Sequence, residues 1–166
     1  MGFAVDVAVR VGELSDSTLV ARRFASQDML LCAAPGYLDR CGTPRRVEQL
    51  SAHRPILFRM PTSGRERPWH LAVNGRTVTL HPAARLRFND GEAMVVAALL
   101  GLGIAQLPNY MVEDEIAQGL LVELLPRQRP ASTPIHAVIP ASRMVPARVR
   151  VFLDAVAGLG RKAKAR

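Results

Sequence analysis

The sequence is poor in cysteine and in aromatic residues. Its two cysteines, Cys32 and Cys41, stand nine positions apart, with no C-x-x-C pair and no neighbouring histidine pair. This spacing indicates neither a disulfide framework nor a zinc site, so both are predicted to be free, reduced thiols. Aromatic residues make up only 5% of the chain, which is little for a surface that stacks on nucleic-acid bases.

Long apolar runs and targeting signals are also absent from the sequence. The longest apolar run, residues 93–105, is broken by Gly101 and Gly103 and is shorter than the ~20 residues of a membrane-spanning helix. The first residues show no basic segment, apolar core or small-residue cleavage site, so the protein is expected to be cytoplasmic and without membrane contact.

The charge is unbalanced and almost free of lysine. The formal net charge is +8, and 20 of the 22 basic residues are arginines, scattered from Arg10 to Arg166. A basic protein suits a nucleic-acid partner when its cations are clustered. Because these are dispersed and aromatic residues are few, we assign most of them to solvated surfaces.

Short apolar segments alternate with helical ones along the 166 residues, of which 49% are hydrophobic. Val5, Val7, Val9 and Val11 show the period of two of a half-buried strand. The patterns predict strands at 5–11, 19–25, 28–34, 56–59, 69–73, 77–80, 85–88, 104–107, 120–125 and 135–139, and helices at 35–41, 47–50, 91–100, 110–118 and 146–157. This order predicts an α/β protein with mixed, mostly parallel sheets and short antiparallel additions.

Three local signals sharpen these predictions. Asn74-Gly75 between two alternating segments predicts a type I′ hairpin. Asn89 and Glu92 have the offset of a capping box at the start of a helix. The last predicted helix carries one apolar stripe with helical spacing, formed by Val149, Phe152, Leu153 and Val156. A proline-rich linker is expected at residues 126–134.

Motifs for enzyme chemistry find no support. Gly101-Leu102-Gly103 resembles a dinucleotide-binding loop, but it follows a helix, and Gln106 stands where the third glycine belongs. There is no G-x-S-x-G elbow and no P-loop, and the four histidines have no metal-ligand spacing. Asp90 and Glu92 are explained by helix capping. We therefore predict no catalytic residue, metal or cofactor.

Arg59 is the residue whose position most suggests a ligand. It ends a predicted strand and precedes the polar loop Met60-Pro61-Thr62-Ser63-Gly64. Strand ends that open into loops are where α/β sheets place ligands, and a guanidinium binds a carboxylate through two parallel hydrogen bonds. A surface arginine beside a flexible loop explains the pattern equally well, so both interpretations stay open.

Six segments, in their order and spacing, resemble the effector-binding domain of LysR-type transcriptional regulators. They cover nearly the whole chain and are residues 6–14, 19–23, 32–38, 89–93, 101–108 and 148–152. The resemblance implies a fold like type-2 periplasmic binding proteins, with two lobes joined by two crossover strands near residues 25–28 and near Val122. Lobe I would comprise residues 1–27 and 122–166, and lobe II residues 28–121. Relative to the family pattern the chain starts inside lobe I, which implies an incomplete first lobe and no winged helix-turn-helix.

The resemblance also implies which residues face the effector. They are expected in three places: the turn at Val11 and Gly12, the loop from Arg59 through Pro61, Thr62 and Ser63, and the pair Asn89 and Asp90 before a helix. Arg59 and Asn89 should then lie close together. The guanidinium of Arg59 and the backbone N–H groups at the helix start near Gly91 would hold an anion such as a carboxylate.

The function implied is a small-molecule sensor domain, not an enzyme. Its full-length parent would be a homo-oligomeric transcriptional regulator that contacts DNA only through the missing winged helix. Two alternatives stay open: a free-standing solute-binding module or a remnant without function, and an enzyme built on a similar two-lobed fold.

Overall fold

The chain divides into two compact units. The computed structural model describes residues 6–14, 19–140 and 146–163. Unit 1 comprises Met1–Gln27 and Ser132–Arg166, and unit 2 comprises Asp28–Ala131. The first boundary falls where the sequence predicts it. The predicted return near Val122 is wrong, because β9 (Val122–Leu124) pairs with β3 (Met29–Ala33) and so stays in unit 2.

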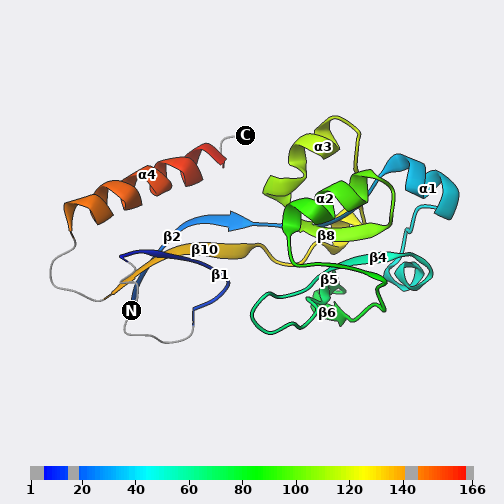
Figure 1. The fold of residues 1–166 in the computed structure, drawn as a ribbon, viewed down its shortest axis with the longest axis horizontal. Helices are drawn as coiled ribbons and strands as arrows, with labels where there is room; N and C mark the ends of the chain where they lie inside the picture. Colours follow the sequence, from blue (N-terminus) through cyan, green and yellow to red (C-terminus); the bar gives the residue numbers. More distant parts are fainter. Residues whose placement is uncertain (1–5, 15–18, 141–145, 164–166) are drawn as a thin grey trace. The chain divides into compact units, whose positions relative to one another are not determined.

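Unit 1 is a three-stranded antiparallel sheet with one helix packed on it. The strand order is β1 (Ala8–Val11), β10 (Thr133–Pro140), β2 (Leu19–Gln27). Helix α4 (Ala147–Ala163) packs along β2 (Figure 1). The predicted strand at 5–11 is present from Ala8; Val5 lies outside the described residues. The predicted linker is shorter than expected, because β10 already begins at Thr133 and pairs with Gln27.

The apolar stripe of α4 is narrower than the sequence pattern indicates. Val149 and Val156 are buried, but Phe152 is 45% exposed. Phe152 lies at the edge of the stripe, and the three described strands of unit 1 leave that edge uncovered. Two solvent-exposed ion pairs also link the helix to Asp6 and to β2. Arg148 donates from Nε and Nη2 to the two carboxylate oxygens of Asp6 at 2.9 and 3.1 Å, and Arg22 Nη1 lies 3.5 Å from Asp154 Oδ1.

Unit 2 is built on a five-stranded mixed sheet. The strand order is β7 (Leu86–Phe88), β4 (Pro55–Phe58), β8 (Ile104–Pro108), β3, β9. Strand β4 is parallel to both of its neighbours, whereas β3 is antiparallel to β8 and β9. Mixed sheets are predicted correctly, but among the described strands antiparallel pairings outnumber parallel ones. The prediction of mostly parallel sheets is wrong because chain order alone does not show that β3 lies between β8 and β9.

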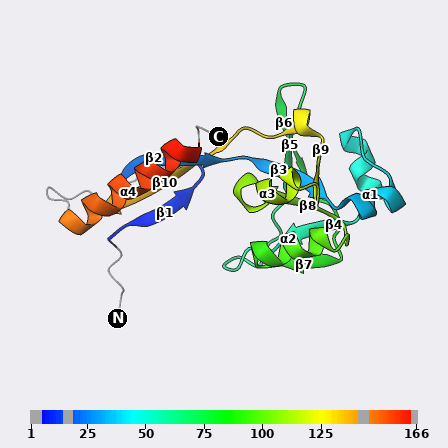
Figure 2. The same cartoon turned by 90° about the horizontal axis from the view of Figure 1, so that it is seen from above.

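The sheet of unit 2 is buried on both faces. Helix α2 (Gly91–Leu99) covers one face, and the β5–β6 hairpin (Trp69–Val73 and Arg76–Leu80) lies on the other, as Figures 1 and 2 show. Side chains alternate between the faces of a strand. In β8, Ala105 and Leu107 therefore join the core under α2, while Ile104 joins the core under the hairpin. That second core also receives α1 (Pro35–Cys41) and the 3₁₀ turn Val47–Ala52.

The predicted hairpin turn is confirmed. Asn74 and Gly75 have φ angles of 50° and 73°, the left-handed values that a type I′ turn requires at both central positions. The single helix predicted at 110–118 is divided into the 3₁₀ turn Asn109–Met111 and α3 (Glu113–Ala117). The break falls at Val112, whose side chain is completely buried in the core. A further 3₁₀ turn, Pro126–Gln128, follows β9.

The two cysteines are free thiols in different surroundings, and their reactivity should differ. Cys32 in β3 is buried and Cys41 is exposed. Burial raises the pKa of Cys32 to about 12, and the carboxylates of Glu123 and Glu115 add to the effect. At pH 8 only ~1 in 10⁴ of the Cys32 side chains would be thiolate, the reactive form. We expect an aromatic disulfide reagent to modify Cys41 alone in the native chain and both cysteines in denaturant. Equal rates for both thiols in the native chain would contradict this.

Candidate functional site

A pocket of about 400 Å³ lies in unit 2 at the carboxyl ends of β4 and β7. Its lining residues are Arg59, Met60, Pro61, Gly64, Arg87 and Asn89. The two strands are parallel, with Leu57 paired to Arg87 and Phe58 to Phe88. Because side chains alternate along strands, positions 57 and 59 of one chain segment share a face with 87 and 89 of the other. The register therefore brings Arg59, Arg87 and Asn89 together.

The segment after β4 folds back on itself and forms one wall of the pocket. Arg59 and Glu66 form an isolated antiparallel bridge, and Met60 N–H donates to Arg65 O at 2.8 Å. Between them the chain turns, and Gly64 N–H donates to Met60 O at 2.8 Å. Gly64 has φ +64°, a left-handed conformation that glycine adopts without steric cost. The turn thus holds Met60 and Pro61 as an apolar edge of the pocket.

Among the described residues, the guanidinium of Arg59 has one partner, bound at Nε, and its two terminal nitrogens have none. Its backbone N–H donates to Phe88 O at 2.6 Å, and its side-chain Nε donates to Gly64 O at 3.1 Å. None of the ion pairs in the described parts of the chain includes Arg59. The Nε contact sets the direction of the side chain, and its two terminal nitrogens stay available to an anion.

The second guanidinium of the pocket is paired. Arg87 Nε donates to a carboxylate oxygen of Glu66, with 43% of the Arg87 side chain and 37% of the Glu66 side chain exposed. The surroundings are strongly basic, since residues 59–88 include six arginines and a single acidic residue, Glu66. One of these arginines, Arg67, lies with its guanidinium carbon 5.5 Å from the centre of the Phe58 ring. The local field therefore favours an anionic ligand.

The start of α2 differs from the predicted capping box by one residue. The N-cap is Asp90, not Asn89, and Asp90 Oδ1 accepts from Ala93 N–H at 2.8 Å. Asn89 does not cap the helix, and it lines the pocket instead. The carboxylate of Asp90 already occupies a helix amide, and the space beside Gly91 is filled by Met111. Asp90 and Met111 therefore occupy the place where the resemblance implies an anion held by the backbone near Gly91.

Apart from Asp90, which caps α2 and does not line the pocket, the sequence-predicted site residues fall into three groups. Arg59, Pro61 and Asn89 line the pocket. Thr62 and Ser63 lie in the same turn without lining it, and Ser63 Oγ accepts from Arg65 N–H at 3.3 Å. Val11 and Gly12 belong to unit 1. Gly12 directly follows the last residue of β1, and its N–H donates to Pro134 O at 2.9 Å.

Two lining residues, Gly64 and Arg87, were not predicted, and Met60 lies within the predicted loop from Arg59 to Ser63 without being named as a site residue. Met60 and Gly64 belong to the loop that Arg59 already indicates. Arg87 stands two positions before Asn89, so the period of a strand places both on one face, and this signal was available in the sequence.

Two further features concern the described residues as a whole. Within residues 6–14, 19–140 and 146–163, no three His, Cys, Asp or Glu side chains gather in a way that could bind a metal ion. None of the helices in that part of the chain combines the length and apolarity needed to cross a bilayer.

The chain belongs to the LysR substrate binding domain family, whose model matches residues 3–160. The predicted family and its α/β fold, similar to type-2 periplasmic binding proteins, are thus confirmed.

Two curated relatives and one solved structure illustrate the match. The transcriptional regulator CrgA of Neisseria meningitidis serogroup C is 37% identical over 152 residues, which is 90% of this chain and 50% of that protein. The transcriptional activator AaeR of Escherichia coli K12 is 33% identical over 153 residues, covering 92% of this chain and 48% of AaeR. The structure of the CrgA regulatory domain from N. meningitidis superposes with a TM-score of 0.80 at 31% identity, over 94% of this chain and 76% of that one. The chain therefore spans about half the length of the curated relatives it matches.

Proposed function

We propose that the chain is the small-molecule effector-binding domain of a LysR-type transcriptional regulator, and that its pocket binds a carboxylate. Membership of the family and the regulator names of its relatives support the first part. The second part is carried by one observation: Arg59 presents to the pocket a guanidinium that has no carboxylate partner among the described residues and whose direction is set by its hydrogen bond to Gly64 O.

The lining residues suit recognition of a small organic anion. A carboxylate would accept two parallel hydrogen bonds from the terminal nitrogens of Arg59, a geometry that arginine provides better than lysine. The amide of Asn89 adds a polar group that can donate or accept, and Met60 and Pro61 supply apolar contact for the rest of the ligand. None of the six lining residues is a serine, cysteine, histidine or carboxylate, the usual nucleophiles and bases, which supports binding without turnover.

For the whole protein we propose the following organisation. Unit 1 is part of the first lobe of the effector domain, and unit 2 is the second lobe. The full-length parent is a cytoplasmic homo-oligomer that contacts DNA through a winged helix outside this chain. Ligand binding would regulate the parent only through its difference in affinity between two conformations.

The proposal is tested by calorimetric titration of the chain with small carboxylic acids and with their neutral amides, using butyrate and butyramide as the first pair. We expect the acid to bind and the amide not to bind. Arg59→Gln should weaken binding of the acid by roughly 10- to 100-fold, because a charge-assisted bidentate contact is lost.

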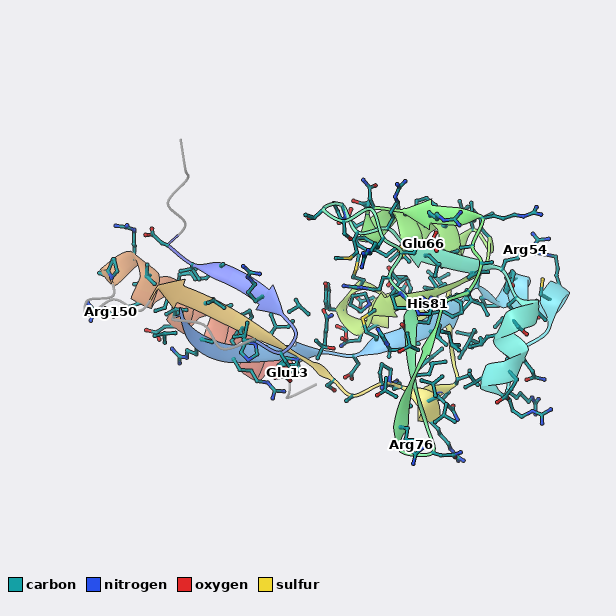
Figure 3. All side chains as sticks on the ribbon, turned by 90° about the horizontal axis from the view of Figure 1, so that it is seen from below. Glu13, Arg54, Glu66, Arg76, His81 and Arg150 are labelled. Carbon is teal, nitrogen blue, oxygen red and sulfur yellow. The ribbon has the colours of Figure 1, made fainter. Side chains whose placement is uncertain are left out.

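Arg76→Gln is the matched control. Arg76 lies in unit 2 at the tip of the β5–β6 hairpin, far from the loop of Glu66 in Figure 3, and does not line the pocket. This variant should bind like the wild type. Equal binding of acid and amide, or equal loss of binding in both arginine variants, would contradict the proposal.

A further inference from the structure

We infer that the pocket selects a ligand with two anionic groups, one bound by Arg59 and the other by Arg87, and that Glu66 imposes this selection by occupying Arg87 when the pocket is empty. This inference rests on the proposed function and adds to it the class of ligand and a specificity-determining residue.

The two guanidinium groups of the pocket differ in one respect that matters. Both line it, but Arg59 is bound only to a carbonyl oxygen, whereas Arg87 is neutralised by the carboxylate of Glu66. Among the described residues, the pocket thus offers one guanidinium without a carboxylate partner, that of Arg59, and one with such a partner, that of Arg87. Because Glu66 contacts Arg87 at Nε, a second carboxylate of the ligand would compete with Glu66 for the charge of Arg87.

Glu66 is placed for this exchange by the backbone. The bridge between Arg59 and Glu66 fixes Glu66 on the returning arm of the loop, and β4 is the direct neighbour of β7, which carries Arg87. The carboxylate therefore contacts a lining residue of the pocket, Arg87, although Glu66 does not line the pocket itself. The carboxylate of Glu66 binds Arg87 in the way that we expect the second carboxylate of the ligand to bind it.

The exchange costs little because the pair is open to water. More than a third of each side chain is exposed, and an ion pair in such surroundings is weak because solvent screens it. Once displaced, Glu66 turns to solvent and is hydrated. A ligand that is already held at Arg59 by its first carboxylate has an advantage over free anions in solution. Its second carboxylate meets Arg87 at high effective concentration, because the two carboxylates belong to one molecule.

The surrounding charges match a dianion better than a monoanion. Displacement of Glu66 leaves the pocket with two unpaired guanidinium groups, and Arg65, Arg67 and Arg85 are close in sequence to them. The next residue after Asn89 in the sequence, Asp90, carries a carboxylate, but this group accepts a hydrogen bond from the Ala93 amide at the start of α2. A monocarboxylate would neutralise Arg59 only, and would leave the Glu66–Arg87 pair as it is.

The experiment compares butyrate with the dicarboxylates succinate and glutarate by calorimetric titration of the chain. For the wild type we expect the better of the two dicarboxylates to bind at least tenfold more tightly than butyrate. Glu66→Gln should raise dicarboxylate affinity severalfold and widen the preference for dicarboxylates over butyrate. Arg87→Gln should lower dicarboxylate affinity and remove this preference, so that dicarboxylates bind that variant no more tightly than butyrate does.

The two variants also control for each other. Both remove the same ion pair, so a purely structural role for that pair would change binding in the same direction in both. The inference requires opposite directions, with melting temperatures recorded to show that both variants fold. If dicarboxylates bind no better than butyrate and Arg87→Gln has no effect, the inference is wrong while the proposed carboxylate site stands. If no acid binds to the wild type, both are wrong.

Discussion

Gly103→Ala should destabilise unit 2 by about 3 kcal/mol or more, the upper range for overpacking a rigid site. A Cβ at this position would lie 2.2 Å from the carbonyl oxygen of Arg54 and 3.1 Å from its carbonyl carbon. That carbonyl accepts from Ile104 N–H at 2.8 Å. The Arg54 N–H in turn donates to the hydroxyl of buried Tyr37 at 2.9 Å. The backbone at Arg54 is thus held on both sides and has little freedom to move away.

The measurement is urea unfolding followed by the fluorescence of Trp69, which is buried in the core of the same unit. Gly36→Ala is the matched control. The nearest atom to a Cβ there is the flexible Arg40 Nη1 at 3.7 Å, and the residue lies in the first turn of α1. It should stay within about 0.5 kcal/mol of the wild type. Equal midpoints for the two alanine variants would show that the Gly103–Arg54 contact is not rigid.

Gln106→Leu is the second substitution with a large expected cost, roughly 2–4 kcal/mol. Gln106 is buried at 6% exposure in β8. Its Oε1 accepts from His70 N–H at 3.1 Å, and its Nε2 donates to His70 O at 2.8 Å. The side-chain amide thus pairs with the backbone of β5 as a neighbouring strand would. Leucine fills a similar volume but leaves the backbone N–H and C=O of His70 without these partners, at about 1–2 kcal/mol each, because His70 is only half-buried.

The same urea titration measures this effect, with Gln118→Leu as control. Gln118 is exposed at the end of α3, so its replacement should change the free energy of unfolding by no more than about 0.5 kcal/mol. If Gln106→Leu were as stable as that control, the paired amide bonds would not be what fixes the hairpin to the sheet.

Elements with a local cause could be predicted from the sequence. The Asn74-Gly75 turn follows from the backbone angles that those two residues tolerate. The end of α2 is likewise marked in the sequence by the glycines that follow the helix. The return crossing could not be located in this way. Residues 122–124 look like any extended segment, and only their pairing with β3, about 90 positions earlier, keeps them in unit 2. The break at Val112 likewise depends on a core that the local pattern does not show.

In the candidate site, too, the residues with a local signal could be predicted from the sequence, and those that depend on long-range pairing could not. Arg59 and Asn89 could be selected because each follows a strand and precedes a turn or a helix, and the structure places both on one pocket. The strand period already places Arg87 on the same face as Asn89, but its position beside Arg59 depends on the parallel register of β4 and β7, which a single sequence does not contain. The N-cap of α2 is Asp90, one residue after the predicted Asn89. Asn and Asp are both good caps, so the sequence pattern does not distinguish between them. The effector contacts expected of Val11 and Gly12 stay predictions.

The central claim is that ligand binds at the carboxyl ends of β4 and β7, on the guanidinium of Arg59. It is tested most directly by recording the arginine Nε–H signals of the ¹⁵N-labelled chain during a titration with succinate. The account predicts a saturable shift of the Arg59 signal, with the Arg76 signal unmoved. A saturable shift of other arginines while the Arg59 signal stays in place would contradict it.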